Sequence, residues 1–356
     1  MKTVLKLIII TLVSLVAFGA CKEKRYFSFE ERHVVKTFPE TYDPVFVGSF
    51  DFGLIGVQGI KVLDDYMVMS CNSEQGCVCL VTTKGELQSV TLLKRGNGPG
   101  EILYRPFMSW MSFSKDERYA YVYDHKGNYL EYDLLSSMSE GRPVWRYLAE
   151  NLPMDEGARY FYIDKNRLLC RKCKARRDGY ERHIVDYQGN VIDTQNVMPL
   201  NSISASEMNL LSTGFAINPE LNRVAELGSR LNVIHLYSYE DKFAMTLSLG
   251  DEICELDDLE QLPDDKMRKM YYDTKSFDHF FAALYLGVTI DELDSGTFDN
   301  PRIHIFDWDG NPIAEINVPV RSLFFDIDVN EEKLYVVEYE TEHILKYDIS
   351  EICDKL

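Results

Sequence analysis

The sequence predicts an all-β fold, a six-bladed β-propeller with a short helical insertion. The main observation is a unit of two strands around a turn centred on Gly or Asp, which recurs six times along the chain. A second alternating run precedes most of these units, so each block holds about four short strands, as a propeller blade does. Aromatic residues make up 12% of the chain and are mostly Tyr and Phe, which suits packing between twisted sheets.

The recurring units are predicted from strand alternation and turn chemistry. Apolar residues alternate with polar ones in each strand, and Lys-Gly, Gln-Gly and Asp-Gly pairs supply the positive φ that tight hairpin turns require. The units occupy residues 79–93, 120–134, 183–194, 233–249, 303–318 and 343–350.

The propeller is predicted to span residues 41–352 and to close its ring with a strand from near the N-terminus. The preceding strand runs are clearest at residues 61–71, 159–173 and 324–340. Because an unpaired edge strand invites aggregation, a strand near 33–38 or 45–50 is expected to join the last blade.

One segment, residues 251–281, breaks the repeat pattern. It is acidic at first and amphipathic afterwards, and Met267, Met270 and Tyr271 fall at helical spacing after Pro263. We expect a helical insertion here that lies on one face of the disc. Insertions on a propeller face often line the binding side.

The N-terminus carries the features of a lipoprotein signal peptide, predicted to be residues 1–20. Lys2 and Lys6 precede an apolar stretch at residues 7–18, and two small residues stand directly before Cys21. Small side chains before a cysteine form a lipobox, so Cys21 is the expected lipidation site, with acyl chains such as palmitate. The alternative is an ordinary secretory signal with a structural cysteine nearby.

Either reading places the mature protein outside the cytoplasm, facing the periplasm or on the cell surface. Residues 21–40 are expected to form a tether, together with the possible ring-closing strand. Each buried acyl methylene adds about 0.8 kcal/mol, so two or three chains on Cys21 make a stable membrane anchor. No second apolar stretch reaches the roughly 18 residues of a membrane helix.

The charge balance argues against nucleic acid as a partner. The chain has 38 Lys and Arg against 57 Asp and Glu, and loss of Lys2 and Lys6 with the signal peptide takes the net charge from −19 to −21. Such a field disfavours nucleic acid and anionic lipid head groups but permits divalent cations and basic partners. We expect a monomer.

Seven of the eight cysteines lie beyond Cys21, and their pairing cannot be deduced from spacing. Cys170 and Cys173 form a C-x-x-C with cationic neighbours, which would lower a thiol pKa as a redox motif requires. Their surroundings alternate as in a strand, whereas a thioredoxin-like motif needs a helix N-terminus. A redox or zinc site there is kept as a minor alternative.

Three stretches now carry a resemblance to a known family. Residues 95–101 (RGNGPGE), 281–287 (FAALYLG) and 305–312 (IFDWDGNP) resemble signatures of the TolB-like six-bladed propeller lipoproteins of Bacteroidetes. The resemblance runs from the lipobox to about residue 350. It implies the propeller fold and a lipid-anchored location, and it transfers no catalytic residues.

The most distinctive candidate for ligand binding is the loop at residues 95–105. Its glycines allow backbone amides to point together and hold an anion or a peptide carboxylate. The alternative is a structural turn between blades in which Glu101 caps free amides. The candidate binding residues are Arg95, Gly96, Asn97, Gly98, Gly100, Glu101 and Arg105.

No catalytic or metal-ligating residue and no cofactor is predicted. Residues 307–311 (DWDGN) resemble half of a calcium loop, but Gly310 is misplaced for an EF-hand and a hairpin turn explains every residue. The seven histidines are scattered, and three of them, His183, His304 and His343, precede the second strand of a repeated unit. A propeller could still bring distant His and Glu side chains together at its axis.

The leading interpretation is a membrane-tethered binding or scaffolding module for a protein, peptide or glycan ligand in the cell envelope. The alternative is a propeller-type lyase or hydrolase with a metal or carboxylate site at the central channel. Convergent His, Asp and Glu at the axis would favour the enzyme, and an aromatic or apolar surface would favour binding.

Overall fold

The computed structural model describes residues 24–356, except 73–75, 85–86, 125, 155–156, 175–178, 194–197, 251–252 and 354. The predicted signal peptide and Cys21 lie outside the described residues. Within the described part of the chain, no helix is both long and apolar enough to span a membrane.

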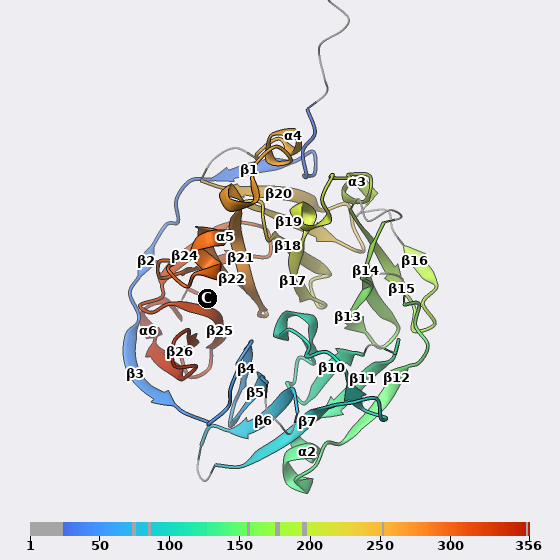
Figure 1. The fold of residues 1–356 in the computed structure, drawn as a ribbon, viewed down its shortest axis with the longest axis vertical. Helices are drawn as coiled ribbons and strands as arrows, with labels where there is room; N and C mark the ends of the chain where they lie inside the picture. The colour runs from blue at the N-terminus through green and yellow to red at the C-terminus, as the bar shows by residue number, and fades with distance from the viewer. Residues whose placement is uncertain are drawn as a thin grey trace, which may run out of the picture.

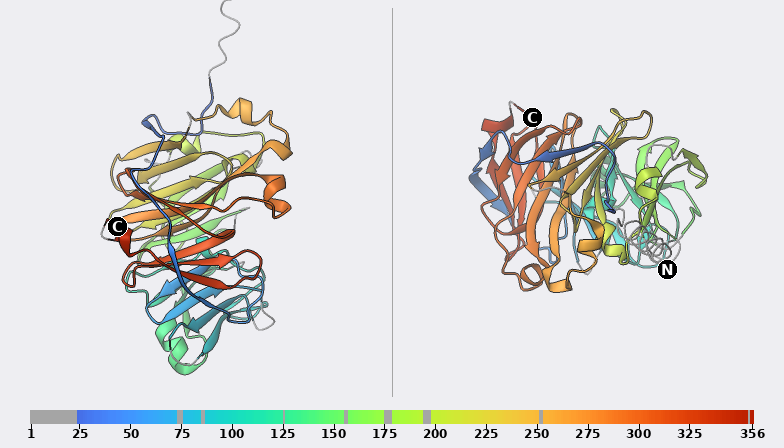
Figure 2. Two further views of the ribbon diagram at one scale, coloured as in Figure 1. Left: turned by 90° about the vertical axis from the view of Figure 1, so that its left-hand side faces the viewer. Right: turned by 90° about the horizontal axis from the view of Figure 1, so that it is seen from above.

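Six mainly antiparallel sheets are arranged in a ring around a central axis, which confirms the predicted six-bladed propeller (Figure 1). The edge-on views show a disc, with the N-terminal segment running along its outer side (Figure 2).

The blades follow one another along the chain. Blade 1 contains β4 (Ile60–Leu63), β5 (Tyr66–Ser70), β6 (Val78–Thr82), β7 (Ser89–Arg95) and β8 (Glu101–Ile102). Blade 2 contains β9 (Ser112–Phe113), β10 (Tyr119–Tyr123), β11 (Tyr129–Asp133) and β12 (Trp145–Ala149). Blade 3 contains β13 (Arg159–Asp164), β14 (Arg167–Cys173), β15 (Tyr180–Val185) and β16 (Val191–Asp193).

The other three blades each include a strand from the N-terminal segment. Blade 4 contains β17 (Thr213–Asn218), β18 (Arg223–Gly228), β19 (Val233–Ser238), β20 (Ala244–Leu249) and β1 (Arg32–Val35). Blade 5 contains β21 (Arg268–Ser276), β22 (Phe280–Thr289), β23 (Arg302–Asp307), β24 (Pro312–Asn317) and β2 (Thr41–Tyr42). Blade 6 contains β25 (Ser322–Asp328), β26 (Lys333–Glu338), β27 (Ile344–Asp348) and β3 (Val45–Phe50).

The helices among the described residues are short and lie in the connections. They are η1 (Met108–Trp110), α2 (Leu134–Glu140), α3 (Met198–Asn201), η3 (Met208–Leu211), α4 (Leu256–Leu259), η4 (Asp264–Lys266), α5 (Ile290–Asp294) and α6 (Ser350–Cys353).

The core consists of six clusters of buried apolar side chains, one at each junction between neighbouring blades. In strand β22, successive side chains point to opposite faces of the sheet and so pack into two different junctions. Phe281 and Ala283 pack toward blade 4, whereas Ala282 and Leu284 pack toward blade 6. Because both faces of the sheet are buried, this strand reads as a continuous apolar run.

The N-terminal segment closes the ring and covers two further sheet edges. Strand β3 pairs antiparallel with β27 and completes blade 6, so residues 45–50 are the ring-closing strand of the two candidates. Strands β1 and β2 instead add parallel strands outside β20 and β24. These strands cover the outer edges of β20, β24 and β27 and become the outermost strands of blades 4, 5 and 6.

Much of the expected tether is packed against the disc. Phe27 and Phe29 are only 1% and 3% exposed, and their rings contact His235 at centroid distances of 4.4 and 6.0 Å. Arg25 forms ion pairs with Asp257 and Glu260. The chain is therefore held to the disc from Arg25 onward.

The expectation of a helix at Met267, Met270 and Tyr271 is wrong. Among the described residues of the 251–281 segment, helical structure is limited to α4 and η4, and residues 268–276 form β21, the innermost strand of blade 5. β21 pairs with β22 over most of its length, and this long-range pairing outweighs the local spacing of three apolar residues.

Three hairpin turns share the sequence D-x-x-G-N and one hydrogen-bonding pattern. In the turn at residues 307–311, Asp307 Oδ1 accepts the backbone N–H groups of Asp309 and Asn311 at 3.0 and 2.8 Å. Asn311 Nδ2 donates to the other carboxylate oxygen at 2.8 Å, and Gly310 has a φ of +88°. The turns at 124–128 and 186–190 repeat these contacts. The Asp307 carboxylate thus organises the hairpin turn itself.

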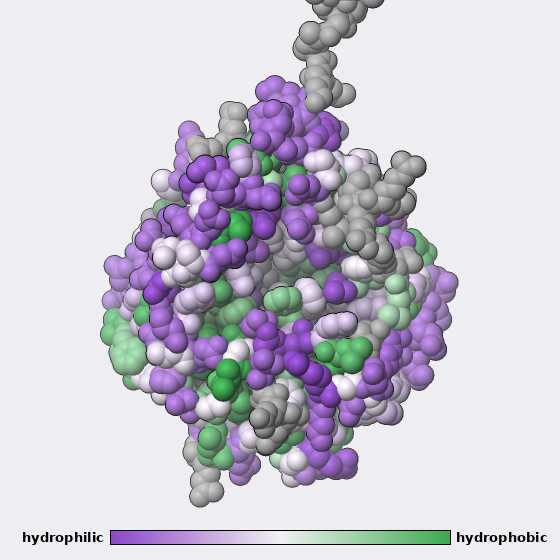
Figure 3. Space-filling view, in the orientation of Figure 1, coloured by the Kyte–Doolittle hydropathy of each residue, from purple (hydrophilic) through white to green (hydrophobic). Residues whose placement is uncertain are grey.

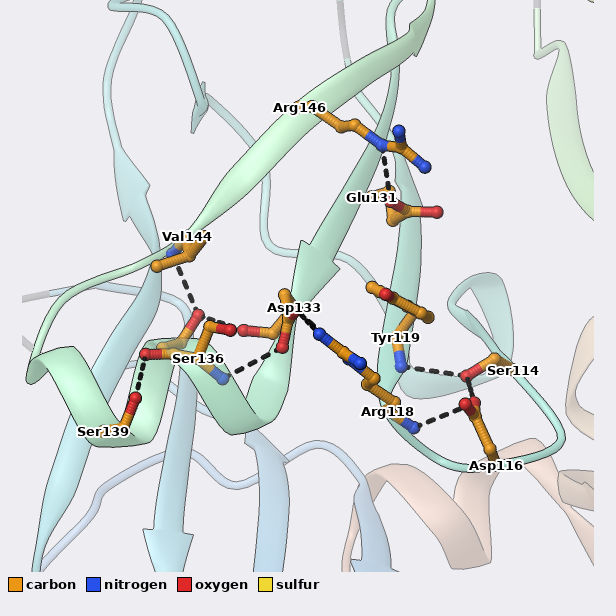
Figure 4. Close-up of polar contacts among 11 residues, drawn as sticks. Ser114, Asp116, Arg118, Tyr119, Glu131, Asp133, Ser136, Ser139, Val144 and Arg146 are labelled. Carbon is orange, nitrogen blue, oxygen red and sulfur yellow. Dashed lines mark hydrogen bonds and ion pairs between the residues drawn. The ribbon is translucent and has the colours of Figure 1, made fainter.

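Blade 2 shows how charged side chains hold a blade edge together (Figure 4). Asp133 ends β11 and caps α2 by accepting the backbone N–H of Ser136 at 2.9 Å. Its other carboxylate oxygen accepts Arg118 Nη2 at 2.8 Å, while Arg146 donates to Glu131 on the next strand at 2.6 Å. These cations each have a carboxylate partner, as is usual on this protein.

Candidate functional site

The glycine-rich loop predicted as a binding site lies between β7 and β8 and is closed by its own carboxylate. Glu101 Oε2 accepts the backbone N–H of Gly98 at 2.7 Å, and the Glu101 N–H donates to Gly98 O at 3.1 Å. A Cβ added at Gly96 would come within 2.1 Å of Glu101 Oε2, so the absence of a side chain there makes room for this carboxylate. Lys126 Nζ donates to the carbonyls of Asn97 and Gly98 at 2.6 and 2.7 Å.

The two arginines beside the loop are used in local contacts. Arg95 Nη2 donates to Asn72 Oδ1 at 2.8 Å, and Arg105 Nη1 donates to Gly56 O at 2.6 Å. Gly100 has a φ of +70° and packs against Trp145. An external anion would have to displace Glu101, and anion binding by this loop stays a prediction.

The chain continues from this loop into η1, which projects toward the centre of the ring (Figure 1). A cavity of about 280 Å³ lies there, and its lining comes from all six blades or the segments leading into them. The space-filling view shows the face of the disc hollowed near its centre (Figure 3). The lining residues are Gln58, Phe107–Trp110, Phe161, Arg171, Ser212–Phe215, Leu227, Ser229, Lys269, Tyr271–Thr274 and Phe324. We call this cavity the axial pocket.

Aromatic rings form much of the wall of the axial pocket, and they are fixed by contacts with one another. Phe107 meets Trp110 edge-on with ring centroids 4.7 Å apart. Phe161 of blade 3 lies 4.8 Å from Phe215 of blade 4. Such pairs hold flat apolar surfaces in place around the opening.

Arg171 is the most deeply buried cation of the lining, with 7% of its surface exposed. Its Nη1 donates to Thr213 O at 2.8 Å and to Thr213 Oγ1 at 3.2 Å, and the guanidinium lies 4.4 Å from the Tyr180 ring centroid. The Nε atom is buried and has no hydrogen-bond partner. Burial lowers the pKa of Arg171 because its charge is poorly solvated.

Lys269 contributes a second cation to the lining. It lies at the start of β21. Its ammonium lies 5.0 Å from the Tyr272 ring centroid, and no carboxylate of the described residues forms an ion pair with it. Burial, together with the nearby charge of Arg230, lowers the pKa of Lys269 to about 8.

Two further arginines stand just outside the lining. Arg159 lies over the Trp110 ring at 4.4 Å, and Arg230 follows Ser229 and carries a buried Nη1 atom without a hydrogen-bond partner. Burial lowers the pKa of both guanidinium groups. Neither arginine has an ion-pair partner in the described part of the chain. We refer to Arg159, Arg171, Arg230 and Lys269 as the axial cations.

Two buried carboxylates near the lining, Asp273 and Glu226, are bound by other groups, whereas Asp264 and Asp294 act on Arg230 without forming an ion pair among the described residues. Asp273 is the single acidic residue among the described residues of the lining, and it lies 3.2 Å from Lys275 and accepts the backbone N–H of Thr274 at 2.9 Å. Glu226 is fully buried and forms a two-point ion pair with Arg182. The axial pocket therefore carries a net positive charge within an acidic protein.

Sequence reasoning found only part of this site. It selected the 251–281 segment as lining the binding side, and residues 269–274 do line the pocket, though as a strand. It did not find Arg171, Trp110 or Lys269. Arg171 stands between the two cysteines of RLLCRKC, and its local signal in the sequence is the lack of a nearby acidic residue.

The other candidates from the sequence lie away from the axial pocket. Cys170 is 5% exposed and lies on β14, which is a strand as predicted. Burial raises the pKa of a different cysteine, Cys77, to about 11. His183 and His304 lie in the third strands of blades 3 and 5, and His343 directly precedes β27. Among the described residues, no group of three or more His, Cys, Asp and Glu side chains is placed to hold a metal ion.

Comparisons with known proteins support the architecture. No family model and no curated protein matches the chain. Among solved structures, a protein of Bacteroides fragilis provisionally described as exported is similar at 12% identity with a TM-score of 0.51, covering 89% of this chain and 98% of that one. The β-propeller domain of Cps50 (Swd1) from Myceliophthora thermophila aligns at 11% identity with a TM-score of 0.45, covering 86% of this chain and all of that one. The six sheets around one axis place the chain in the class of six-bladed β-propellers, with a surface pocket at its axis.

Proposed function

We propose that this protein is a lipid-anchored binding module outside the cytoplasm, and that its ligand, a protein, peptide or glycan of the cell envelope, sits in the axial pocket. The observation that carries the proposal is the lining itself: fixed aromatic rings and cations without carboxylate partners converge on one cavity from all parts of the ring. Convergent polar groups in a largely apolar and aromatic cavity are typical of ligand sites.

The location part of the proposal is supported by the lipobox at Cys21 and by the resemblance to TolB-like propeller lipoproteins. The B. fragilis neighbour provisionally described as exported is consistent with it. Arg25 is held by Asp257 and Glu260, and it stands four residue steps after Cys21 in the sequence. A chain spans at most about 3.6 Å per residue, so a lipidated Cys21 would keep this edge of the disc within roughly 14 Å of its anchor.

The rival interpretation, a lyase or hydrolase with metal or carboxylates at the channel, has less support. The single carboxylate in the described lining, Asp273, is engaged by Lys275 and by the Thr274 backbone. The rings and axial cations suit the holding of a ligand.

Tryptophan fluorescence tests the proposal without knowing the ligand beforehand. The chain has three tryptophans, and of these Trp110 lines the pocket. Libraries of glycans and peptides are titrated against the protein, with thermal unfolding as a second readout, since a ligand that binds the folded state raises Tm. We expect a ligand that changes the fluorescence in wild type and not in Trp110→Phe.

A pocket-filling variant, Ser229→Tyr, provides the control for site. Ser229 lines the cavity and its hydroxyl makes no hydrogen bond among the described residues, so a larger side chain can enter the cavity. Binding that survives Ser229→Tyr in a folded protein would place the ligand elsewhere and overturn the proposal.

A further inference from the structure

We propose that the axial pocket recognises the carboxylate of an acidic sugar residue, of the uronic acid kind, within a glycan. The inference rests on the proposed function of this pocket and adds the chemical class of the ligand. Its basis is a buried arginine with an unpartnered Nε, a lysine without a carboxylate partner, and the rings and hydroxyl groups that surround them.

The charge of the protein makes the axial cations unusual. Acidic residues exceed basic ones by 19, and many arginines elsewhere are in ion pairs, including Arg118, Arg146, Arg167, Arg223 and Arg302. Other arginines bond to neutral oxygens instead, as Arg32, Arg95, Arg105 and Arg268 do. The axial cations are four cations without an ion pair in the described part of the chain that are gathered around one cavity, and two of them carry a buried nitrogen without an acceptor. Burying an unneutralised cation costs several kcal/mol, so a site that keeps several of them is suited to an anion from outside.

The arrangement of the cations favours a carboxylate. Arg159 and Arg171 lie opposite each other on β13 and β14, and Lys269 enters the cavity from blade 5. The free Nε of Arg171 is a donor without an acceptor, and the Lys269 ammonium supplies further donors. Charge-assisted hydrogen bonds from Arg and Lys to a carboxylate are about twice as strong as neutral ones.

The remaining lining indicates a sugar. A sugar ring presents C–H groups on its faces and hydroxyl groups at its edge, and the pocket offers aromatic faces together with small polar side chains. The polar groups are Gln58, Ser109, Ser212, Thr213 and Ser229. A cavity of about 280 Å³ is at the lower end of ligand pockets, and it suits one ring rather than a folded peptide.

The test compares acidic sugars with their neutral counterparts by isothermal titration calorimetry on the full mature chain. The ligands are galacturonate and glucuronate oligosaccharides, the same oligosaccharides as methyl esters, and the neutral galactose and glucose oligomers. We expect at least one uronate to bind, and the matching ester and neutral sugar to bind at least tenfold more weakly.

Lys269→Met removes a charge while keeping the side-chain length, and Lys269→Arg keeps the charge. We expect the uronate preference to fall at least tenfold in Lys269→Met and to persist in Lys269→Arg. Lys115→Met is the matched control, because Lys115 is exposed and pairs with Glu220 outside the pocket. It should leave binding unchanged.

The outcomes separate this inference from the proposed function. Equal binding of neutral and acidic sugars, or binding of peptide carboxylates without uronates, would overturn the acidic-sugar inference while the pocket function stands, provided Trp110→Phe abolishes the fluorescence change. Absence of any uronate binding would also overturn it. A binding affinity that is unchanged in both Trp110→Phe and Ser229→Tyr would overturn the pocket function itself.

Discussion

Two buried arginines lie directly opposite each other on neighbouring strands of blade 3, and they differ in whether a carboxylate binds them directly. Arg182 on β15 is 1% exposed and holds Glu226 through Nε contacts of 3.0 and 2.8 Å. Burial acts to lower its pKa, but Glu226 outweighs burial and raises the pKa of Arg182 above its ordinary value. Arg171 on β14 has no such carboxylate, and its pKa is lowered.

The comparison teaches that the blade interior and the axis are built on different principles. In the interior, Glu226 also accepts the Thr213 hydroxyl and the Tyr237 hydroxyl, at 2.6 and 3.3 Å, so the network is nearly complete. At the axis, two buried hydrogen-bond donors, Arg171 Nε and Arg230 Nη1, have no acceptor. A cation with unmet hydrogen-bonding capacity in a cavity is a candidate functional group.

The largest expected effect follows from breaking the complete network. Arg182→Met leaves Glu226 buried without its cation, and removal of one partner of a buried pair typically costs about 3–5 kcal/mol. Urea unfolding should show a loss of that size in the free energy of unfolding. A loss under 1 kcal/mol would show that the pair contributes little and would weaken the contrast with Arg171.

The next effect concerns pH and the same network. His235 is fully buried, and burial lowers its pKa to about 3 from the ordinary 6.5. The unfolded chain therefore takes up a proton below pH 6.5 that the folded protein does not accept until near pH 3. Stability should fall as the pH is lowered through this window, by roughly 3 kcal/mol from this residue between pH 7 and 4.

His235→Phe tests this assignment. The ring packs on Phe27 and its Nε2 atom has no hydrogen-bond partner, so a phenyl ring keeps the packing and loses one contact, the 3.0 Å hydrogen bond between Nδ1 and Thr246 Oγ1. Denaturant unfolding from pH 7 to 4 should show a flatter pH dependence for the variant. An unchanged slope would assign the pH dependence to other groups.

A smaller effect on stability is expected in the glycine-rich loop, where Glu101 accepts a backbone N–H of the loop itself, just as polar groups of the blade interior bond to one another. Glu101→Ala removes the acceptor for the Gly98 N–H, and loss of such a hydrogen bond should cost about 1–2 kcal/mol. Glu30→Ala, at an exposed position, is the control in the same urea experiment. If uronate affinity instead rose in Glu101→Ala, the freed loop amides rather than the axis would be the anion site.

The smallest effect on stability is expected at the axis itself. Arg171→Met removes no ion pair and relieves a buried charge, while it loses the contacts with Thr213. We expect the free energy of unfolding to change by less than about 1 kcal/mol. A loss as large as that of Arg182→Met would show that Arg171 is a structural residue.

The blades could be predicted from the sequence because their signals are local. Turns such as 186–190 and 307–311 need Asp, Gly and Asn at fixed positions for hydrogen bonds within five residues. The innermost strand β21 lacked such a signal. Its Asp273 and Lys275 are buried polar residues that pair with each other. The sequence of β21 therefore lacks the alternation of apolar and polar residues that predicts a strand.

The axial pocket could not be predicted because its residues come from distant parts of the chain. Trp110, Arg171 and Lys269 meet only when the ring closes, and the C-x-x-C that contains Arg171 does not indicate an anion site. The conspicuous motif at residues 95–101 proved to bind its own carboxylate in the structure. Nothing in the local sequence distinguishes a glycine loop that is filled by Glu101 from one that is open.

The account depends most directly on the charge state of the axis, which NMR can measure through the titration of ¹³C-methylated lysines. One lysine resonance should titrate near pH 8, be missing in Lys269→Met, and move to higher pH when a uronate saturates the pocket. If the Lys269 resonance instead titrates near the ordinary lysine value of about 10.4 and does not respond to uronate, the axial pocket does not hold an unneutralised cation that awaits an anionic ligand.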